Sequence, residues 1–284
     1  MQKKSGENKK ISKIFLDING DHLLVNTEAG ETFYFSVRSN RATRGRPVNR
    51  LNNIHIESIA WNHDANSSTT REILIGAKDG SISETYLEIS DHIANARYLR
   101  QVRNFGNPII GLHVEKPTTD TREVFIATKA SLTIFSGRIT PKKSHVDVAP
   151  IYSTFFDEAN SGQFQELSGS TSAPKIAILP QSVGDIRSGH VNPCFAWITS
   201  LGLFHGNVHS AKSSGDDSIF SDTILLPFTS VFSTYVKDKP VYPALSQFHI
   251  LLLHENQLVA VNRLNNRIVF NETISSVIPY SLAD

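Results

Sequence analysis

The chain has 284 residues and a mass of 31.5 kDa, with 39% hydrophobic and 19% charged residues. This composition supports a packed core and excludes a globally disordered chain. Its 28 lysines and arginines balance 27 acidic residues, so net charge gives no argument for binding nucleic acid or an anionic membrane.

Cysteine content and hydropathy bear on the compartment. Cys194 is the only cysteine, so no disulfide can form within the chain, which is typical of a reducing compartment. Residues 1–10 are polar and basic; they predict a flexible tail and lack the apolar core of a secretory signal. The longest apolar runs, such as Ile250 to Leu253, are too short to span a bilayer.

A hairpin pattern recurs five times along the chain. Each unit is an apolar strand, a tight polar turn and a second strand in which apolar and polar residues alternate. The units cover residues 23–35, 73–83, 124–135, 195–204 and 250–261. Their first residues are 50, 51, 71 and 55 residues apart. Three of these steps are close to the length of a four-stranded propeller blade, roughly 40–50 residues.

Further apolar runs indicate how the hairpins extend into blades. Runs at residues 14–16, 56–61, 109–114 and 175–179 precede four hairpins and predict the innermost strand of each blade. Blades stacked in a ring bury faces that a single blade leaves open. We therefore expect an all-β fold, a β-propeller of WD40-like architecture with seven blades, one of them irregular or incomplete. Residues 11–284 are predicted to form this single domain.

The connections between hairpins carry other signals. The loop after the first hairpin holds five arginines: Arg38, Arg41, Arg44, Arg46 and Arg50. A solvated connection explains them, and so does contact with an acidic partner or phosphoinositide headgroups. Residues 90–101 lack strand alternation and predict one or two helical turns. Residues 140–174, with the aromatic cluster Tyr152, Phe155 and Phe156, are interpreted as an insertion that lengthens the third step.

The chain shows no motif of a catalytic or nucleotide-binding site. Glycine-rich phosphate loops, the G-x-S-x-G elbow and the H-E-x-x-H helix are all missing from the sequence. His254 and Glu255 begin like a zinc motif, but Leu258 stands where the second histidine belongs, so a solvated hairpin tip is preferred. Asp185 and Arg187 have no base or nucleophile nearby in sequence. We expect no catalytic residue, no cofactor, no metal and no small-molecule substrate.

Four polar residues resemble a calcium loop. Asp17, Asn19, Asp21 and Glu28 match positions 1, 3, 5 and 12 of an EF-hand, whereas His22 replaces the glycine needed at position 6. A hairpin turn at Asn19 and Gly20 is therefore the preferred interpretation.

Histidine, cysteine and tryptophan residues elsewhere favour structural roles over chemistry. His205 and His209 have a helical metal-ligand spacing but follow a strand, which favours a structural or surface role. Cys194 lies beside Phe195 and is interpreted as a small buried hydrophobe. Trp61 and Trp197 lie in apolar strands and are expected in the core rather than as exposed stacking platforms. No strand face interleaves basic and aromatic residues, so we expect no nucleic-acid binding.

Several segments together resemble the N-terminal propeller of the vacuolar protein sorting-associated protein 18 family. They follow the family's order and cover nearly the whole chain. The matching segments are residues 11–24, 56–62, 73–77, 80–84, 195–198, 202–206 and 247–253.

The resemblance implies a non-catalytic subunit of the class C vacuolar sorting core, which the HOPS and CORVET tethering complexes share. It implies a cytoplasmic protein, peripheral on late endosome and vacuole or lysosome membranes, that acts in vesicle fusion as a protein–protein interaction scaffold. The expected partners are other class C core subunits and membrane-fusion proteins, with indirect membrane contact. The family's α-solenoid and RING domains have no counterpart in this sequence, so a ubiquitin-ligase role does not carry over.

Two other hypotheses compete with this one. The loop from Arg38 to Arg50 could read anionic lipid directly, making the chain a peripheral membrane module. An enzyme on a propeller scaffold would need acidic or histidine residues that converge, and the sequence shows no such set. For the scaffold hypothesis, the expected contact residues are Arg38, Arg41, Arg44, Arg46, Arg50, Tyr152, Phe155 and Phe156.

Overall fold

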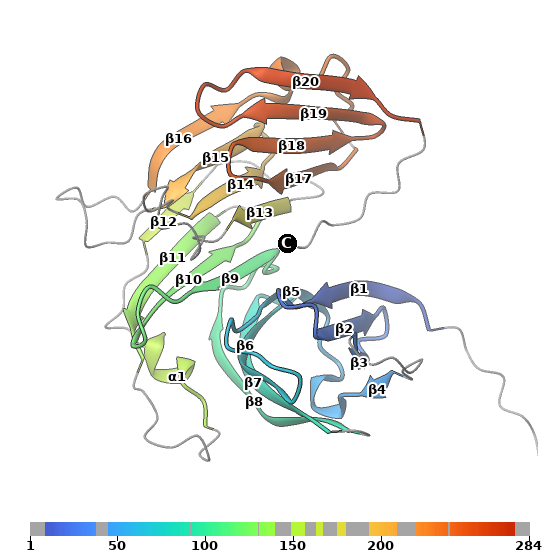
Figure 1. The fold of residues 1–284 in the computed structure, drawn as a ribbon, viewed down its shortest axis with the longest axis vertical. Coiled ribbons are helices and arrows are strands. Elements are labelled where there is room, and N and C mark those ends of the chain that lie inside the picture. The colour runs from blue at the N-terminus through green and yellow to red at the C-terminus, as the bar shows by residue number, and fades with distance from the viewer. Residues whose placement is uncertain are drawn as a thin grey trace, which may run out of the picture. The chain divides into compact units, whose positions relative to one another are not determined.

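Figure 1 shows a computed structural model of the chain, which describes residues 9–37, 45–90, 93–129, 131–139, 149–156, 163–166, 175–179, 193–208, 220–237 and 239–275. The described residues form five four-stranded sheets, here called blades, and each blade joins strands that are consecutive in the chain. The chain divides into two compact units. Unit 1 comprises residues 1–112 and 140–157, and unit 2 comprises residues 113–139 and 158–282.

Unit 1 contains the first two blades. Blade 1 joins β1 (Ile11–Leu16), β2 (His22–Thr27), β3 (Thr32–Ser36) and β4 (Arg46–Pro47). The 3-10 helix η1 (Asn49–Leu51) follows, and blade 2 joins β5 (Ile56–Ala60), β6 (Thr69–Ala77), β7 (Ser81–Ile89) and β8 (Ala94–Asn104). The short helix α1 (Tyr152–Phe155) also belongs to this unit.

The core of unit 1 lies between its two blades. Leu24 and Tyr34 of blade 1 share a buried cluster with Ile73 and Ile75 of blade 2, and all four are at most 1% exposed. Alternate residues of a strand point to one face, so each hairpin supplies this cluster from every second position. Full burial of such an aliphatic side chain stabilises the fold by about 1.5–3 kcal/mol.

Unit 2 contains the remaining three blades, apart from the first two residues of β9. Blade 3 joins β9 (Gly111–Glu115), β10 (Thr121–Ala127), β11 (Ser131–Arg138) and β12 (Gln163–Glu166). Blade 4 joins β13 (Lys175–Leu179), β14 (Cys194–Ile198), β15 (Leu203–Val208) and β16 (Phe220–Leu226). Helix α2 (Phe228–Val231) leads to blade 5, which joins β17 (Val241–Leu245), β18 (His249–His254), β19 (Gln257–Asn262) and β20 (Ile268–Thr273).

Blades 4 and 5 share an apolar cluster in unit 2. Ala196 and Ile198 of β14 pack with Val241 of β17 and with Ile250 and Leu252 of β18. As a result of this packing, β17 of blade 5 contacts both β13 and β14 of blade 4. Stacked blades thus bury one another's apolar faces here, as the hairpin repeats predict.

The structure confirms the all-β propeller architecture but not the number of blades. All five hairpins form where predicted, and the four apolar runs before them lie in β1, β5, β9 and β13. The described residues form five blades, so the expectation of seven is wrong. Each blade uses one hairpin repeat, and in the 71-residue third step the elements described between β11 and β14 are α1, β12 and β13 rather than an additional blade.

The helical turns predicted for residues 90–101 are also wrong, because this segment forms most of β8. Ala94 and Ala96 are buried, while Asn95 and Arg97 are exposed. The register with β7 shifts between Thr85 and Leu87, which breaks the alternation that a sequence pattern needs. Helices α1 and α2 have four residues each, and no helix within the described ranges has the length and hydropathy to cross a bilayer.

Candidate functional site

Two arginines from the predicted basic loop reach across unit 1 to blade 2. Arg38, Arg41 and Arg44 lie outside the described residues. Arg46, on β4, donates to the backbone carbonyl of Ser90 at 2.8 Å, and its guanidinium lies 5.9 Å from the centre of the Tyr34 ring. Arg50, in η1, donates to the backbone carbonyl of Arg97. Both side chains therefore contact the β7–β8 hairpin.

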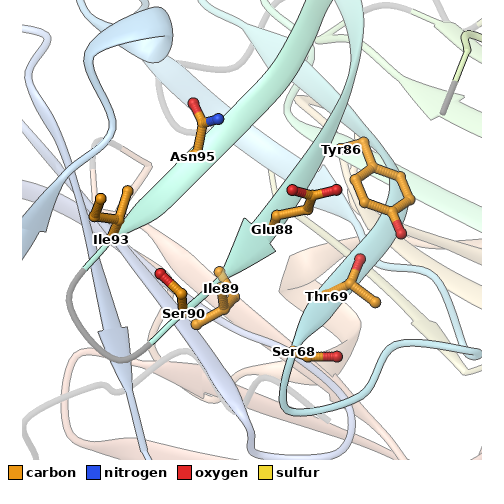
Figure 2. Close-up of a pocket in the computed structure, with 8 residues that line it drawn as sticks. All are labelled: Ser68, Thr69, Tyr86, Glu88, Ile89, Ser90, Ile93 and Asn95. Atoms are coloured by element: carbon orange, nitrogen blue, oxygen red, sulfur yellow. The ribbon is translucent and has the colours of Figure 1, made fainter.

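The same hairpin borders a pocket of about 460 Å³. Figure 2 shows its lining, which comes from β7, β8, the segment between them and the start of β6. The lining residues are Ser68, Thr69, Tyr86, Glu88, Ile89, Ser90, Ile93 and Asn95. Ser68, Ile93 and Asn95 are exposed, so the pocket opens to solvent. The lining combines hydroxyl and amide groups with two isoleucines, so the pocket suits a ligand that has both polar and apolar parts.

Two arginines contact residues that line this pocket, and a third contacts one of those two arginines. Arg46 bonds the carbonyl of Ser90, and Arg97 pairs with Glu88 through Nε and Oε1 at 2.7 Å. Arg50 holds the backbone of Arg97. The side chain of Arg97 keeps 50% of its surface exposed, so its charge is accessible to a partner. We refer to Arg46, Arg50 and Arg97 with the pocket as the rim site.

The predicted aromatic contacts lie inside unit 1 rather than on its surface. Tyr152, Phe155 and Phe156 are at most 4% exposed. Phe155 packs edge-on against both neighbours, with ring centroids 5.8 and 5.1 Å away. Arg103 of β8 donates to the carbonyl of Phe156 at 3.0 Å. These rings serve as core in the described structure, and a contact role for them stays a prediction.

A buried carboxylate holds this aromatic segment. Glu84 of β7 has no exposed surface, and its oxygens accept the backbone N–H of Ile151 at 2.8 Å and of Tyr152 at 2.9 Å. The hydroxyl of Tyr98 donates to the same carboxylate at 2.9 Å. Burial raises the pKa of Glu84, and the three donors act in the opposite direction. The sequence around Glu84 does not predict this role, because the hydrogen-bond partner Ile151 lies 67 residues further along the chain.

The calcium-like residues build a turn. Oδ1 of Asp17 accepts the backbone N–H of Asp21 at 2.7 Å and of His22 at 2.6 Å. Gly20 takes the left-handed conformation at φ 68°, as the preferred hairpin interpretation requires. Glu28 pairs with Lys10 instead of joining Asp17. Asp17 and Gly20 therefore form a hairpin turn, which was the preferred interpretation.

The residues singled out in unit 2 also have structural surroundings. Cys194 is buried, and burial raises the pKa of its thiol. His205 is buried, and its Nε2 lies 2.8 Å from Oδ1 of Asn266. The hairpin tip after β18 is solvated as predicted, with Glu255 exposed, whereas His254 at the end of the strand is 2% exposed and its Nε2 accepts the N–H of Val236 at 3.0 Å. His209, Asp185 and Arg187 lie outside the described residues.

The two tryptophans differ in burial. Trp197 is fully buried, and Nε1 has no hydrogen-bond partner among the described residues. Trp61 is half-buried and stacks on the imidazole of His22 at a centroid distance of 6.3 Å. The expectation that both anchor the core is thus confirmed for Trp197, while Trp61 packs at its edge.

Sequence reasoning named two of the rim arginines and missed the rest of the site. Arg97, Asn95 and Ile93 come from the segment that was expected to be helical. The alternation from Ala94 to Arg97, two small apolar residues interleaved with two polar ones, was the available signal for a strand.

The comparisons with known proteins give a consistent family. A family model described as the Pep3/Vps18/deep orange beta-propeller domain matches residues 1–280. Vacuolar sorting protein 18 of Arabidopsis thaliana is 24% identical over 278 residues, which are 94% of this chain and 26% of that protein. A vacuolar protein sorting-associated protein 18 homolog of Danio rerio is 27% identical over 277 residues, 94% of this chain and 27% of that protein. The chain therefore spans about a quarter of the length of these curated relatives.

Solved structures support the fold. The WD40 domain of SCAP from fission yeast aligns with a TM-score of 0.53 at 10% identity, covering 94% of this chain and 56% of that one. Identity this low supports only the β-propeller fold. The family model, by contrast, covers nearly every residue, in agreement with the resemblance found in the sequence. The chain belongs to the Pep3/Vps18/deep orange β-propeller domain family.

Proposed function

We propose that this chain is a non-catalytic propeller domain of a membrane-tethering subunit that acts in endosome-to-vacuole or lysosome transport and vesicle fusion. Its role is that of a protein–protein interaction scaffold. The family match over residues 1–280 is the observation that carries the proposal. The names of the curated relatives, which refer to vacuolar protein sorting, support it.

The proposed partners are the other class C core subunits of the HOPS and CORVET complexes, with membrane-fusion proteins as further candidates. Such a domain works on the cytoplasmic side of late endosome and vacuole or lysosome membranes, and its membrane contact is indirect. A rigid β scaffold suits this task, because loops on packed blades hold their contact groups at fixed positions.

The environment of the polar residues supports a contact role rather than catalysis. Asp17 closes a turn, Glu84 holds a backbone segment, and His205 bonds to Asn266. Each of these titratable groups thus has a structural use. A propeller enzyme would instead need several of them to converge on one open site.

Affinity capture tests the proposal. The purified chain is immobilised and exposed to each of the other class C core subunits, with an unrelated WD40 propeller as the matched bait. We expect at least one subunit to be enriched on this chain over the control. Equal recovery of every subunit on both baits would contradict the proposal.

A further inference from the structure

We propose that the rim site of unit 1 binds an extended acidic segment of a partner protein, with one apolar side chain of that segment in the pocket. The inference rests on the proposed function for its premise that the partner is a protein. It adds the surface, the residues and the chemical class of the bound segment.

The arginines supply the charge that recognises acidic groups. Arg50 and Arg97 are exposed, and Arg46 is half-buried beside them. The hydrogen bonds of Arg46 to Ser90 and of Arg50 to Arg97 fix the positions of these guanidinium groups. A guanidinium carries five N–H donors, and the bond of Arg50 uses one nitrogen, Nη1. Such pre-positioned arginines bind carboxylates in bidentate geometry with little further ordering.

The pocket adds shape and apolar contact. Ile93 is 60% exposed, and Ile89 and Tyr86 form deeper parts of the lining. A volume of about 460 Å³ accommodates one large side chain of a partner together with water. The hydroxyls of Ser68 and Thr69 lie opposite, on the β6 side, where Figure 2 places them. Peptide recognition commonly combines one such anchor with charges beside it.

The charge arrangement favours a protein over a membrane surface. Glu88 lines the pocket and pairs with Arg97, so the site holds a carboxylate beside its arginine charge. This carboxylate repels a lipid surface of uniform negative charge, whereas a peptide can place its acidic residues at the arginines and its apolar side chain at the pocket. A pocket of about 460 Å³ likewise fits a side chain better than a flat headgroup layer.

The partner contacts side chains at this point rather than adding a strand. β8 is the last strand of the blade 2 sheet, and such edges often pair with an added strand. Here Arg50 already occupies the carbonyl of Arg97. Arg103 similarly connects β8 to the carbonyl of Phe156. Both contacts cover the edge strand with side chains, which natural sheets use to prevent edge pairing.

The test uses fluorescence anisotropy with labelled synthetic peptides of about ten residues, a length that an extended segment needs to cross one blade. The acidic probe carries glutamates and aspartates around a central leucine. A second probe replaces every acid by its amide, and a third replaces the leucine by serine. Vesicles of phosphatidylcholine with phosphatidylserine form the membrane arm. We expect the acidic leucine probe to bind, and the other two probes and the vesicles to bind at least about tenfold more weakly.

The variants separate the rim site from general charge. The double substitution Arg50→Glu and Arg97→Glu should weaken binding of the acidic probe about tenfold or more. The matched control, Arg138→Glu with Arg267→Glu, makes the same change in charge at exposed positions of unit 2 and should leave binding within about twofold. Asn95→Trp fills the pocket from an exposed strand position and should abolish the preference for leucine over serine. Circular dichroism and thermal unfolding confirm that each variant is folded.

Three outcomes overturn the proposal. The first is equal binding of the acidic and amide probes. The second is an equal loss of acidic-probe binding in the double variant of the rim site and in the double variant of the control positions. The third is that the chain binds the vesicles but not the acidic probe, and that the double variant of the rim site no longer binds the vesicles. If capture of class C core subunits by the chain is unaffected by the rim substitutions, this inference fails while the proposed function stands. If neither the chain nor its variants capture any subunit, the proposed function fails as well.

Discussion

Glu84 is the residue on which the packing of the aromatic segment depends. Its carboxylate lies without solvent exposure beneath three donors, the N–H groups of Ile151 and Tyr152 and the hydroxyl of Tyr98. Because buried donors that lose their acceptor keep their full desolvation penalty, removal of this one side chain affects all three groups at once.

We expect Glu84→Ala to lower the free energy of unfolding by roughly 2–4 kcal/mol, since it leaves three buried donors without an acceptor. Hydrogen exchange at the amides of Ile151 and Tyr152 should accelerate. Chemical denaturation and exchange mass spectrometry measure both effects. The control Glu28→Ala removes an exposed carboxylate paired with Lys10 and should change stability by less than about 0.5 kcal/mol. A Glu84 variant as stable as this control would show that the carboxylate is dispensable.

His205 gives unit 2 a dependence on pH. Burial lowers the pKa of the imidazole below its usual 6.5, so the folded state holds the ring neutral while the unfolded state protonates it first. The unfolded state therefore binds more protons at mildly acidic pH, and stability falls as the pH falls through 6.5.

The expected result is that lowering the pH from about 7.5 to about 5.5 costs the wild type roughly 1 kcal/mol more than it costs His205→Asn. The variant keeps a polar group near Asn266 and has no proton to gain. Urea titrations at the two pH values measure the difference. Identical pH dependence in both proteins would mean that His205 is accessible to protons in the folded state.

At the scale of elements, the turns of the hairpins show which glycines matter. Gly80 joins β6 to β7 at φ 87°, and a Cβ there would lie 2.6 Å from the backbone nitrogen of Asn107 and 2.7 Å from that of Gly106. Gly20 has a similar conformation, φ 68°, but no atom lies within 4 Å of the equivalent point. The two turns therefore share backbone strain and differ in crowding.

Alanine substitution at the two positions separates these contributions. Gly20→Ala should cost about 1 kcal/mol, the usual penalty for a side chain in the left-handed region. Gly80→Ala should cost clearly more, about 3 kcal/mol, because backbone atoms cannot move as a flexible side chain can. Thermal unfolding of both variants provides the comparison. Equal losses would show that the loop around Asn107 yields without cost.

The sequence predicted those elements that repeat a simple pattern. Apolar strands next to a glycine turn, as at Ile73 and Gly80, formed as expected because local alternation and turn chemistry agree there. β8 was missed because bulges interrupt its alternation, and its small buried alanines give a weak apolar signal. The rim site was missed with it, since Arg46 and Arg50 reach the carbonyls of Ser90 and Arg97 across 44 and 47 residues of sequence.

At the scale of the whole molecule, the number of blades shows the limit of a period read from sequence. In the part of the chain that the structure describes, five repeats form five blades, and the expectation of seven went beyond the repeats themselves. The long third step likewise suggested an irregular blade, but the elements described between β11 and β14 are only α1, β12 and β13. The number of blades is therefore better predicted from the hairpins counted in the sequence than from the number of blades that is usual for the fold class.

The proposed role of this chain is that of a contact scaffold for vacuolar sorting subunits. Hydrogen–deuterium exchange of the purified chain, alone and with the other class C core subunits, tests that claim most directly. We expect slower exchange in a continuous surface segment when the subunits are present, with the β7–β8 hairpin among the protected peptides. Exchange that is unchanged in every peptide at saturating subunit concentration would contradict the account.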